Sequence, residues 1–69
     1  MRLSARNVLK GTVVSVVRGA VNAQVVLRLE GGCEVLSIIT NESADSLGLK
    51  ENQEAYAVIK ASNVMIAVD

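Results

Sequence analysis

The chain has 69 residues with seven basic and seven acidic side chains, no histidine and no proline, and 51% of its residues are hydrophobic. The balanced charge argues against a nucleic-acid partner, which normally requires an excess or a stripe of Lys and Arg. The single cysteine, Cys33, excludes an intrachain disulfide, and without histidine it makes a structural zinc site improbable. So much apolar side chain in so short a chain predicts an oligomer, because one small core cannot hide it.

No targeting or membrane segment is visible. Polar and charged residues such as Arg2, Ser4 and Arg6 interrupt the start of the chain, where a secretory signal would carry an apolar run. The uncharged apolar stretches are far shorter than the roughly 20 residues that span a bilayer. Together with the lone cysteine, these features predict a cytoplasmic protein with no membrane partner.

The first two predicted strands are separated by glycines. Residues 12–17 are rich in β-branched side chains and are bounded by Gly11 and Gly19. Residues 21–29 then alternate between apolar and polar side chains over most of their length, which is the period of a half-buried strand. The pair Gly31–Gly32 predicts the turn of a β-hairpin, because glycine tolerates positive φ.

A third strand and a short helix follow the hairpin turn. Residues 33–40 form the predicted strand, and its two faces are both largely apolar toward the end, which indicates burial on both sides. Residues 41–49 predict one short helix. Asn41 is the candidate N-cap, and Gly48 is the candidate residue that ends the helix.

Two more strands complete the predicted fold. They cover residues 55–61 and 64–68, with a turn at Ser62 and Asn63 between them. Five strands with one helix between the third and the fourth predict an all-β fold, a small five-stranded OB-like barrel. An open meander sheet is the alternative. No linker or repeat divides the chain, so we expect one domain over residues 1–69.

Few side chains are suited to catalysis. Without histidine, acid–base chemistry would rely on carboxylates, lysine, cysteine or tyrosine. Glu42, Asp45, Glu51 and Glu54 cluster around the helix and its exit, and we interpret them as a solvated surface. Cys33 is interpreted as a small apolar residue, because no nearby histidine could activate its thiol. The sequence therefore predicts a binding protein and not an enzyme.

Two short segments combine a basic residue with other hydrogen-bond donors. Arg6 lies within Ser4–Asn7, and Lys60 opens the segment Lys60–Asn63. Neither basic residue has an Asp or Glu within three positions. Molybdate, tungstate and sulfate are tetrahedral dianions with acceptors only, so they require N–H and O–H donors without a competing carboxylate. Oxyanion binding is thus one interpretation, and ordinary exposed basic residues beside polar turns are the other.

The sequence resembles the molbindins, the stand-alone molybdate-binding Mop domains. The matching segments, which together cover essentially the whole chain, are Ser4–Asn7, Leu9–Gly11, Val25–Leu27, Gly31–Gly32, Ser37–Thr40, Leu47–Lys50 and Ala57–Ala67. The resemblance implies an OB-like barrel that assembles as a hexamer, a trimer of dimers. It also implies that molybdate, and by its similar chemistry tungstate, binds at subunit interfaces without an organic cofactor and without direct coordination of the metal by side chains.

The resemblance further implies which residues bind the oxyanion. The implied set is Ser4, Ala5, Arg6, Asn7, Thr40, Lys60, Ala61 and Ser62. Arg6 and Lys60 would supply positive charge, and Thr40 would donate its hydroxyl. Some relatives carry serine at the position of Ala61, so one hydroxyl donor is absent here or is replaced by Ser62. A second site near a three-fold axis is expected at Gly19, Ala20, Val21 and Asn22, the last of which replaces a threonine of some relatives.

The favoured function is cytoplasmic storage and homeostasis of molybdate. The alternative is an oligomeric module that senses the anion and regulates a partner without storing it. A nucleic-acid-binding OB module is disfavoured, because such modules stack bases on aromatic side chains and this chain has only Tyr56.

Overall fold

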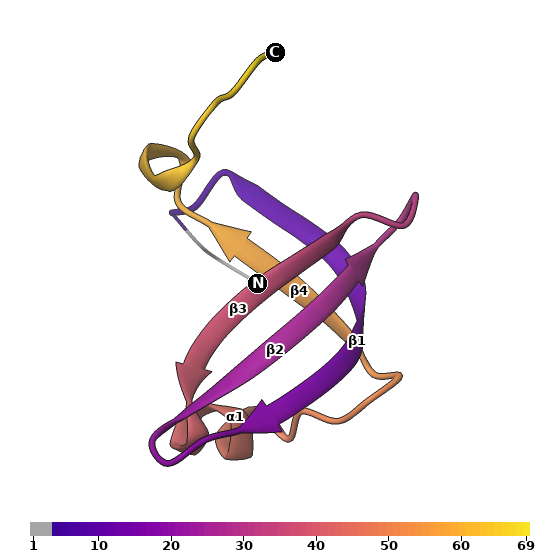
Figure 1. The fold of residues 1–69 in the computed structure, drawn as a ribbon, viewed down its shortest axis with the longest axis vertical. Helices are drawn as coiled ribbons and strands as arrows, with labels where there is room; N and C mark the ends of the chain where they lie inside the picture. The colour runs from indigo at the N-terminus through magenta and orange to yellow at the C-terminus, as the bar shows by residue number, and fades with distance from the viewer. Residues whose placement is uncertain (1–3) are drawn as a thin grey trace.

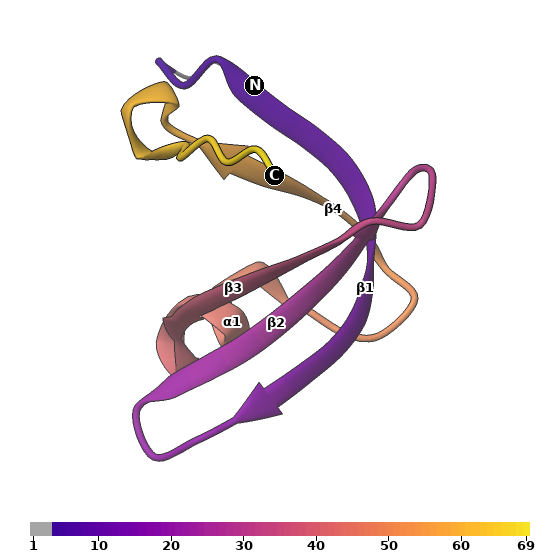
Figure 2. The same ribbon diagram turned by 45° about the horizontal axis from the view of Figure 1, so that its top comes forward.

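The computed structural model describes residues 4–69, and its main element is one antiparallel sheet of four strands in the order β3-β2-β1-β4. The elements are β1 (Asn7–Arg18), β2 (Asn22–Leu29), β3 (Glu34–Thr40), α1 (Asn41–Leu47), β4 (Glu54–Ile59) and a short 3-10 turn (Ala61–Asn63). The sheet curls strongly, so that its two edge strands, β3 and β4, lie across the molecule from each other (Figures 1 and 2).

The first strand is longer than predicted because it serves two neighbours. β1 pairs with β4 from Asn7 to Thr12 and with β2 from Gly11 to Arg18. A bulge interrupts the second ladder between Val13 and Ser15. The backbone of Val13 is held from the other side, because its N–H donates to the Gln53 carbonyl and its carbonyl accepts from Asn52 N, both at 2.8 Å. A bulge increases local twist and bends the strand, which is what the curled sheet requires.

The core is small and is built mainly from alternate residues of the second strand. Val13 and Ala23 are fully buried, and Val25 and Leu27 are almost fully buried. Ala44 brings α1 against the sheet. The period-2 pattern is therefore confirmed for residues 23–29, whereas Val21 lies outside β2 and is exposed. With so few buried side chains, much of the apolar content remains on the surface of the single chain.

The short helix is confirmed, with a different first cap. Thr40, in extended backbone, is the N-cap, and its side-chain oxygen accepts a hydrogen bond from Ser43 N at 3.0 Å. The prediction of Asn41 as N-cap was wrong by one residue, because Asn41 is already helical. Gly48 ends the helix in the left-handed conformation with φ of 62°, as predicted. Gly31 and Gly32 likewise have positive φ and form the predicted hairpin turn.

The predicted fifth strand and the predicted burial of both faces of the third strand are both absent in the single chain. Residues 64–68 form no strand; they extend away from the end of β4 (Figure 1), and Met65, Ile66 and Val68 are 93%, 86% and 91% exposed. A strand needs an adjacent edge with which to pair, and the tail is directed away from the edges of its own sheet. β3 is half-buried on one face only, because Leu36 and Ile38 on the other face are exposed. Four strands are therefore found where five were predicted.

No helix within residues 4–69 has the length and apolar character needed to cross a membrane.

Candidate functional site

Pairing between the first and last strands brings the two donor-rich segments together. Asn7, the first residue of β1, pairs with Ile59, the last residue of β4. Arg6 and Lys60 are each the next residue beyond this final pair, so they lie at the same end of the sheet. These two residues are far apart in the sequence. Antiparallel pairing of β1 with β4 within one chain is sufficient to bring the segments that carry them to the same end of the sheet.

Asn7 links the two segments directly through its side chain. It is half-buried, and its Nδ2 donates a hydrogen bond to the Ile59 carbonyl oxygen at 3.2 Å. An amide nitrogen carries two hydrogens, so one donor of Asn7 is used here and the other is available. The link fixes the backbone immediately before Lys60 to the residue immediately after Arg6.

The turn that follows Lys60 places the remaining predicted residues at this same end. Asn63 N donates to the Lys60 carbonyl at 2.8 Å, and Val64 N donates to the Ala61 carbonyl at 3.2 Å. Ala61 and Ser62 lie within this turn and are exposed. We call this end, defined by residues 4–7 and 60–62, the β1–β4 end.

The basic side chains differ in whether they form ion pairs. Three of the six basic side chains in residues 4–69 form ion pairs on the surface. These pairs are Lys10–Glu54 at 3.2 Å, Arg18–Asp45 at 2.7 Å and Arg28–Glu34 at 3.1 Å. The other three, Arg6, Lys50 and Lys60, make no ion pair within the described residues. Two of these three cations, Arg6 and Lys60, are at the β1–β4 end.

Thr40 and the predicted second site lie at the opposite end of the sheet, beside α1 (Figure 1). Asn22 pairs with Thr40 across the β2–β3 ladder, and Asn41 N donates to the Val21 carbonyl at 2.9 Å. The Asn41 side chain also donates to the Gly19 carbonyl at 3.0 Å. The implied set of oxyanion-binding residues is therefore divided within one chain, with Thr40 next to the second-site segment, residues 19–22.

The hydroxyl of Thr40 already has partners. Its Oγ1 donates to Ser43 Oγ at 2.8 Å in addition to accepting from Ser43 N. In this arrangement the hydroxyl hydrogen of Thr40 is donated to Ser43 of α1. Donation to an oxyanion would require the hydroxyl to rotate.

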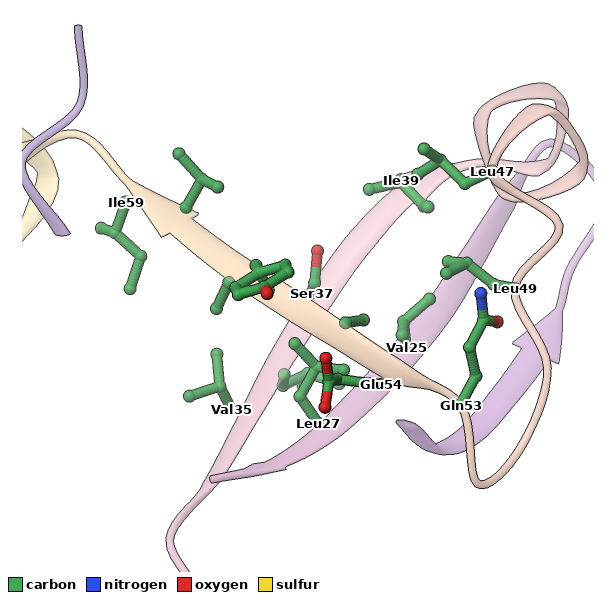
Figure 3. Close-up of a pocket in the computed structure, with 15 residues that line it drawn as sticks. Val25, Leu27, Val35, Ser37, Ile39, Leu47, Leu49, Gln53, Glu54 and Ile59 are labelled. Atoms are coloured by element: carbon green, nitrogen blue, oxygen red, sulfur yellow. The ribbon is translucent and has the colours of Figure 1, made fainter. Parts of the chain in front are cut away.

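An apolar groove lies between the two edge strands (Figure 3). It has a volume of about 590 Å³ and is open to solvent. Val25, Leu27, Val35 and Ile39 line it from β2 and β3, and Ile59 lies on the β4 side. Sequence reasoning missed this groove because it assigned the fifth strand to the same chain. The signal that could have found it was the apolar character of residues 64–68.

The remaining candidate groups lie at the surface of the chain. Glu42, Asp45, Glu51 and Glu54 are exposed, and two of them belong to the ion pairs described above, so the interpretation as solvated surface is confirmed. Cys33 is exposed and does not pack as a small apolar residue, which corrects that interpretation. Residues 4–69 contain no group of three or more Cys, Asp or Glu side chains placed to hold a metal ion.

Comparison with known proteins gives one consistent result. The model of the TOBE domain family matches residues 3–66. Molybdenum-pterin-binding protein 3 of Clostridium pasteurianum is 54% identical over 66 residues, which cover 96% of this chain and 97% of that protein.

Two solved structures support the same relationship. MopII from Clostridium pasteurianum superposes with a TM-score of 0.91 at 48% identity, covering 97% of this chain and all of that chain. ModG, described as a cytoplasmic molybdate-binding protein and solved with molybdate bound, superposes with a TM-score of 0.90 at 57% identity. That match covers 94% of this chain and 46% of the ModG chain.

Proposed function

We propose that this chain binds molybdate at the β1–β4 end. The chain belongs to the TOBE-domain family and, within it, to the stand-alone molybdenum-pterin-binding proteins, which are also called molbindins. The observation that carries the proposal is the Asn7–Ile59 pair, because Arg6 and Lys60 adjoin it at one end of the sheet and neither forms an ion pair within residues 4–69. The bound molybdate in ModG supports the choice of ligand.

The donors at this end match the chemistry of a tetrahedral dianion. Arg6 and Lys60 balance its two negative charges, and Arg6 offers several N–H groups in a fixed fork. Ser4 and Ser62 supply hydroxyls, Asn7 supplies its second amide hydrogen, and Ala5 and Ala61 supply backbone N–H groups. All contacts are made to the oxygens of the anion, so no side chain coordinates the metal and no organic cofactor is needed.

The same chemistry defines selectivity. Tungstate has the charge and shape of molybdate and therefore binds at the same donors. Hydrogen phosphate carries a proton that requires an acceptor, and the charged groups of this site, Arg6 and Lys60, are donors only. Sulfate is smaller, so it cannot reach all donors at once.

The active form in this proposal is a homo-oligomer in which a second copy completes each fold. The groove between β3 and β4 is apolar, and both edge strands have a free side for pairing. The tail, residues 64–68, is apolar, exposed and directed away from its own sheet. We therefore propose that the tail of a second copy supplies the fifth strand. The closed unit is a five-stranded OB-like barrel, a single Mop domain over residues 1–69.

Further association brings the two ends of different copies together. Thr40 cannot reach the β1–β4 end of its own chain, so in a hexamer built as a trimer of dimers it contributes from a neighbouring copy. The segment 19–22, which lies beside Thr40, then forms the second, three-fold site. The proposed role is storage and homeostasis of molybdate in the cytoplasm, the compartment named for ModG, without catalysis.

Native mass spectrometry of the purified chain tests the ligand and the oligomer together. Spectra are recorded without added anion and with molybdate, tungstate, sulfate or phosphate. We expect a hexamer that gains several molybdate or tungstate masses and none from sulfate or phosphate. A hexamer that gains no molybdate would refute the ligand, and a monomer that gains molybdate would refute the interface sites.

The role of the tail is tested by a charge placed on it. Ile66→Asp should dissociate the assembly, because a carboxylate cannot be buried in the apolar groove without a partner. Val17→Asp is the control, since Val17 is also exposed and apolar but lies in β1. An Ile66→Asp protein that keeps the mass of the parent assembly would show that the tail does not occupy the groove.

A further inference from the structure

We infer that Asn7 is a positioning residue: it closes the β1–β4 ladder and fixes, before any anion arrives, the two strand ends from which the segments of Arg6 and Lys60 continue. The inference rests on the proposed function, since it assigns a second duty to a residue of that site. It differs from the expectation that Asn7 only donates to the oxyanion.

The first observation is the place of the Asn7 hydrogen bond. Its Nδ2 donates to the carbonyl of Ile59, the residue with which Asn7 forms the last pair of the ladder. The end pair of a two-strand ladder is the place where the strands separate most easily. A side-chain bond across this pair ties the strands together where the backbone pairing stops.

The second observation is the pair of cations just outside this bond. Arg6 directly precedes Asn7, and Lys60 directly follows Ile59. Neither has an ion-pair partner within residues 4–69, so without an anion their like charges repel each other and favour separation of the strand ends. The Asn7 bond opposes this separation at the nearest point on each strand. A preformed arrangement of donors binds more tightly, because ordering the donors no longer has to accompany binding.

The third observation is the chemical suitability of an asparagine here. Its amide nitrogen has two hydrogens, so one can hold Ile59 while the other remains free for a ligand oxygen. Aspartate has the same shape but only accepts hydrogen bonds at neutral pH, and its charge would attract the two cations in place of the dianion. The backbone also bends at Arg6, immediately before the bond. The strand thus ends where the donor segment begins.

The test compares Asn7→Ala with Gln24→Ala in the full chain. Gln24 is the control, because it is an exposed amide of β2 away from the β1–β4 end and its side chain makes no hydrogen bond within the described residues. Molybdate affinity is measured by calorimetry, and hydrogen exchange of the amides of residues 5, 6, 60 and 61 is measured without anion. We expect Asn7→Ala to weaken molybdate binding about 10-fold and to accelerate exchange at these amides. Gln24→Ala should do neither.

Exchange in the anion-free protein separates positioning from simple ligation. If Asn7→Ala weakens binding while exchange is unchanged, Asn7 is only a ligand and the inference is wrong. If binding and exchange are both unchanged, the inference is also wrong. A parent chain that binds no molybdate would instead refute the proposed function, and the exchange rates would still show whether Asn7 holds the strand ends.

A measurement on the parent chain avoids any effect of substitution on folding. Scalar coupling across the hydrogen bond between the Asn7 side-chain nitrogen and the Ile59 carbonyl carbon is observed by NMR with and without molybdate. We expect the coupling in both states. Its loss on saturation with molybdate would overturn the inference, because the amide would then have exchanged Ile59 for the ligand.

Discussion

Removal of one particular lysine charge should reduce molybdate binding strongly, whereas removal of another should not. The change is Lys60→Ala, and the matched control is Lys50→Ala. Both lysines are exposed, and neither forms an ion pair within the described residues. Each variant therefore loses one positive charge and leaves no carboxylate unpaired. They differ in position, because Lys60 follows β4 at the β1–β4 end and Lys50 precedes that strand.

The expected magnitude follows from the contact that Lys60 makes in the proposed site. A hydrogen bond to a charged group contributes about 1.5–3 kcal/mol net. Since about 1.4 kcal/mol corresponds to tenfold in affinity, its loss predicts a Kd for molybdate that is roughly 10- to 100-fold higher. The Lys50→Ala protein keeps both backbone hydrogen bonds of that residue, from its N–H to Gln53 Oε1 at 3.0 Å and from Gln53 N to its carbonyl at 3.3 Å. Its Kd should stay within about twofold of the parent value, as for exposed charges in high dielectric.

Isothermal titration calorimetry with molybdate measures both values, and the oligomeric mass of each variant is determined in the same samples. Equal mass ensures that an altered Kd does not report altered assembly. Equal affinity of Lys60→Ala and the parent would refute the site at the β1–β4 end. Equal losses in both variants would refute it too, because binding would then depend on total charge and not on position.

Three further predictions concern the fold and are checked by urea unfolding of the parent and each variant. Val13→Ala should lower the free energy of unfolding by about 2–3 kcal/mol, because Val13 is fully buried. The control Val17→Ala, at a 59% exposed position, should lower it by about 0.5 kcal/mol or less. Similar losses of stability in the two variants would contradict the assigned core. Gly48→Ala should cost about 1 kcal/mol through its left-handed backbone alone, since a Cβ there meets nothing within 4 Å; a stabilised variant would disprove this C-cap. Gly11→Ala should lower the free energy of unfolding by about 1–3 kcal/mol, because a Cβ would lie 2.8 Å from the Arg28 carbonyl oxygen. An unchanged midpoint of the urea transition would mean that β1 and β2 are farther apart at this position.

Local signals in the sequence were sufficient for most of the four strands and for the helix. The alternation over residues 23–29 and the pair Gly31–Gly32 each depend on neighbouring residues only, and both were confirmed. The end of the helix at Gly48 is local in the same sense, because a left-handed residue stops a helix whatever surrounds it. The N-cap was misplaced by one residue because Thr40 and Asn41 are both good caps, and only the backbone conformation distinguishes them.

The errors concern features that depend on partners distant in sequence. Residues 64–68 have the composition of a strand, but pairing requires an adjacent edge, and no composition tells which chain supplies it. The exposure of Leu36 and Ile38 has the same origin, since their pattern indicates burial without identifying the covering surface.

The candidate site was predictable in its chemistry but not in its geometry. The donors and cations around Arg6 and Lys60 could be recognised because the type of residue decides what it can donate. Their proximity depends on the register of β1 against β4, and the separation of Thr40 from them depends on the order of the strands. Neither is encoded in a short window of sequence.

The three surface ion pairs have a consequence for how fast and under which conditions an oxyanion arrives. They cancel half of the described basic charges locally, in a chain whose formal net charge is zero. Such a molecule projects little long-range field, so an approaching dianion is not steered from a distance, and its encounter rate is that of nearly uncharged partners. Dissolved salt screens separated charges over about 8–10 Å but leaves hydrogen-bond contacts almost unchanged. In the proposed site, ionic strength therefore has little effect through long-range steering, and its effect on retention of the anion comes from the direct contacts with Arg6 and Lys60, which are exposed in the single chain.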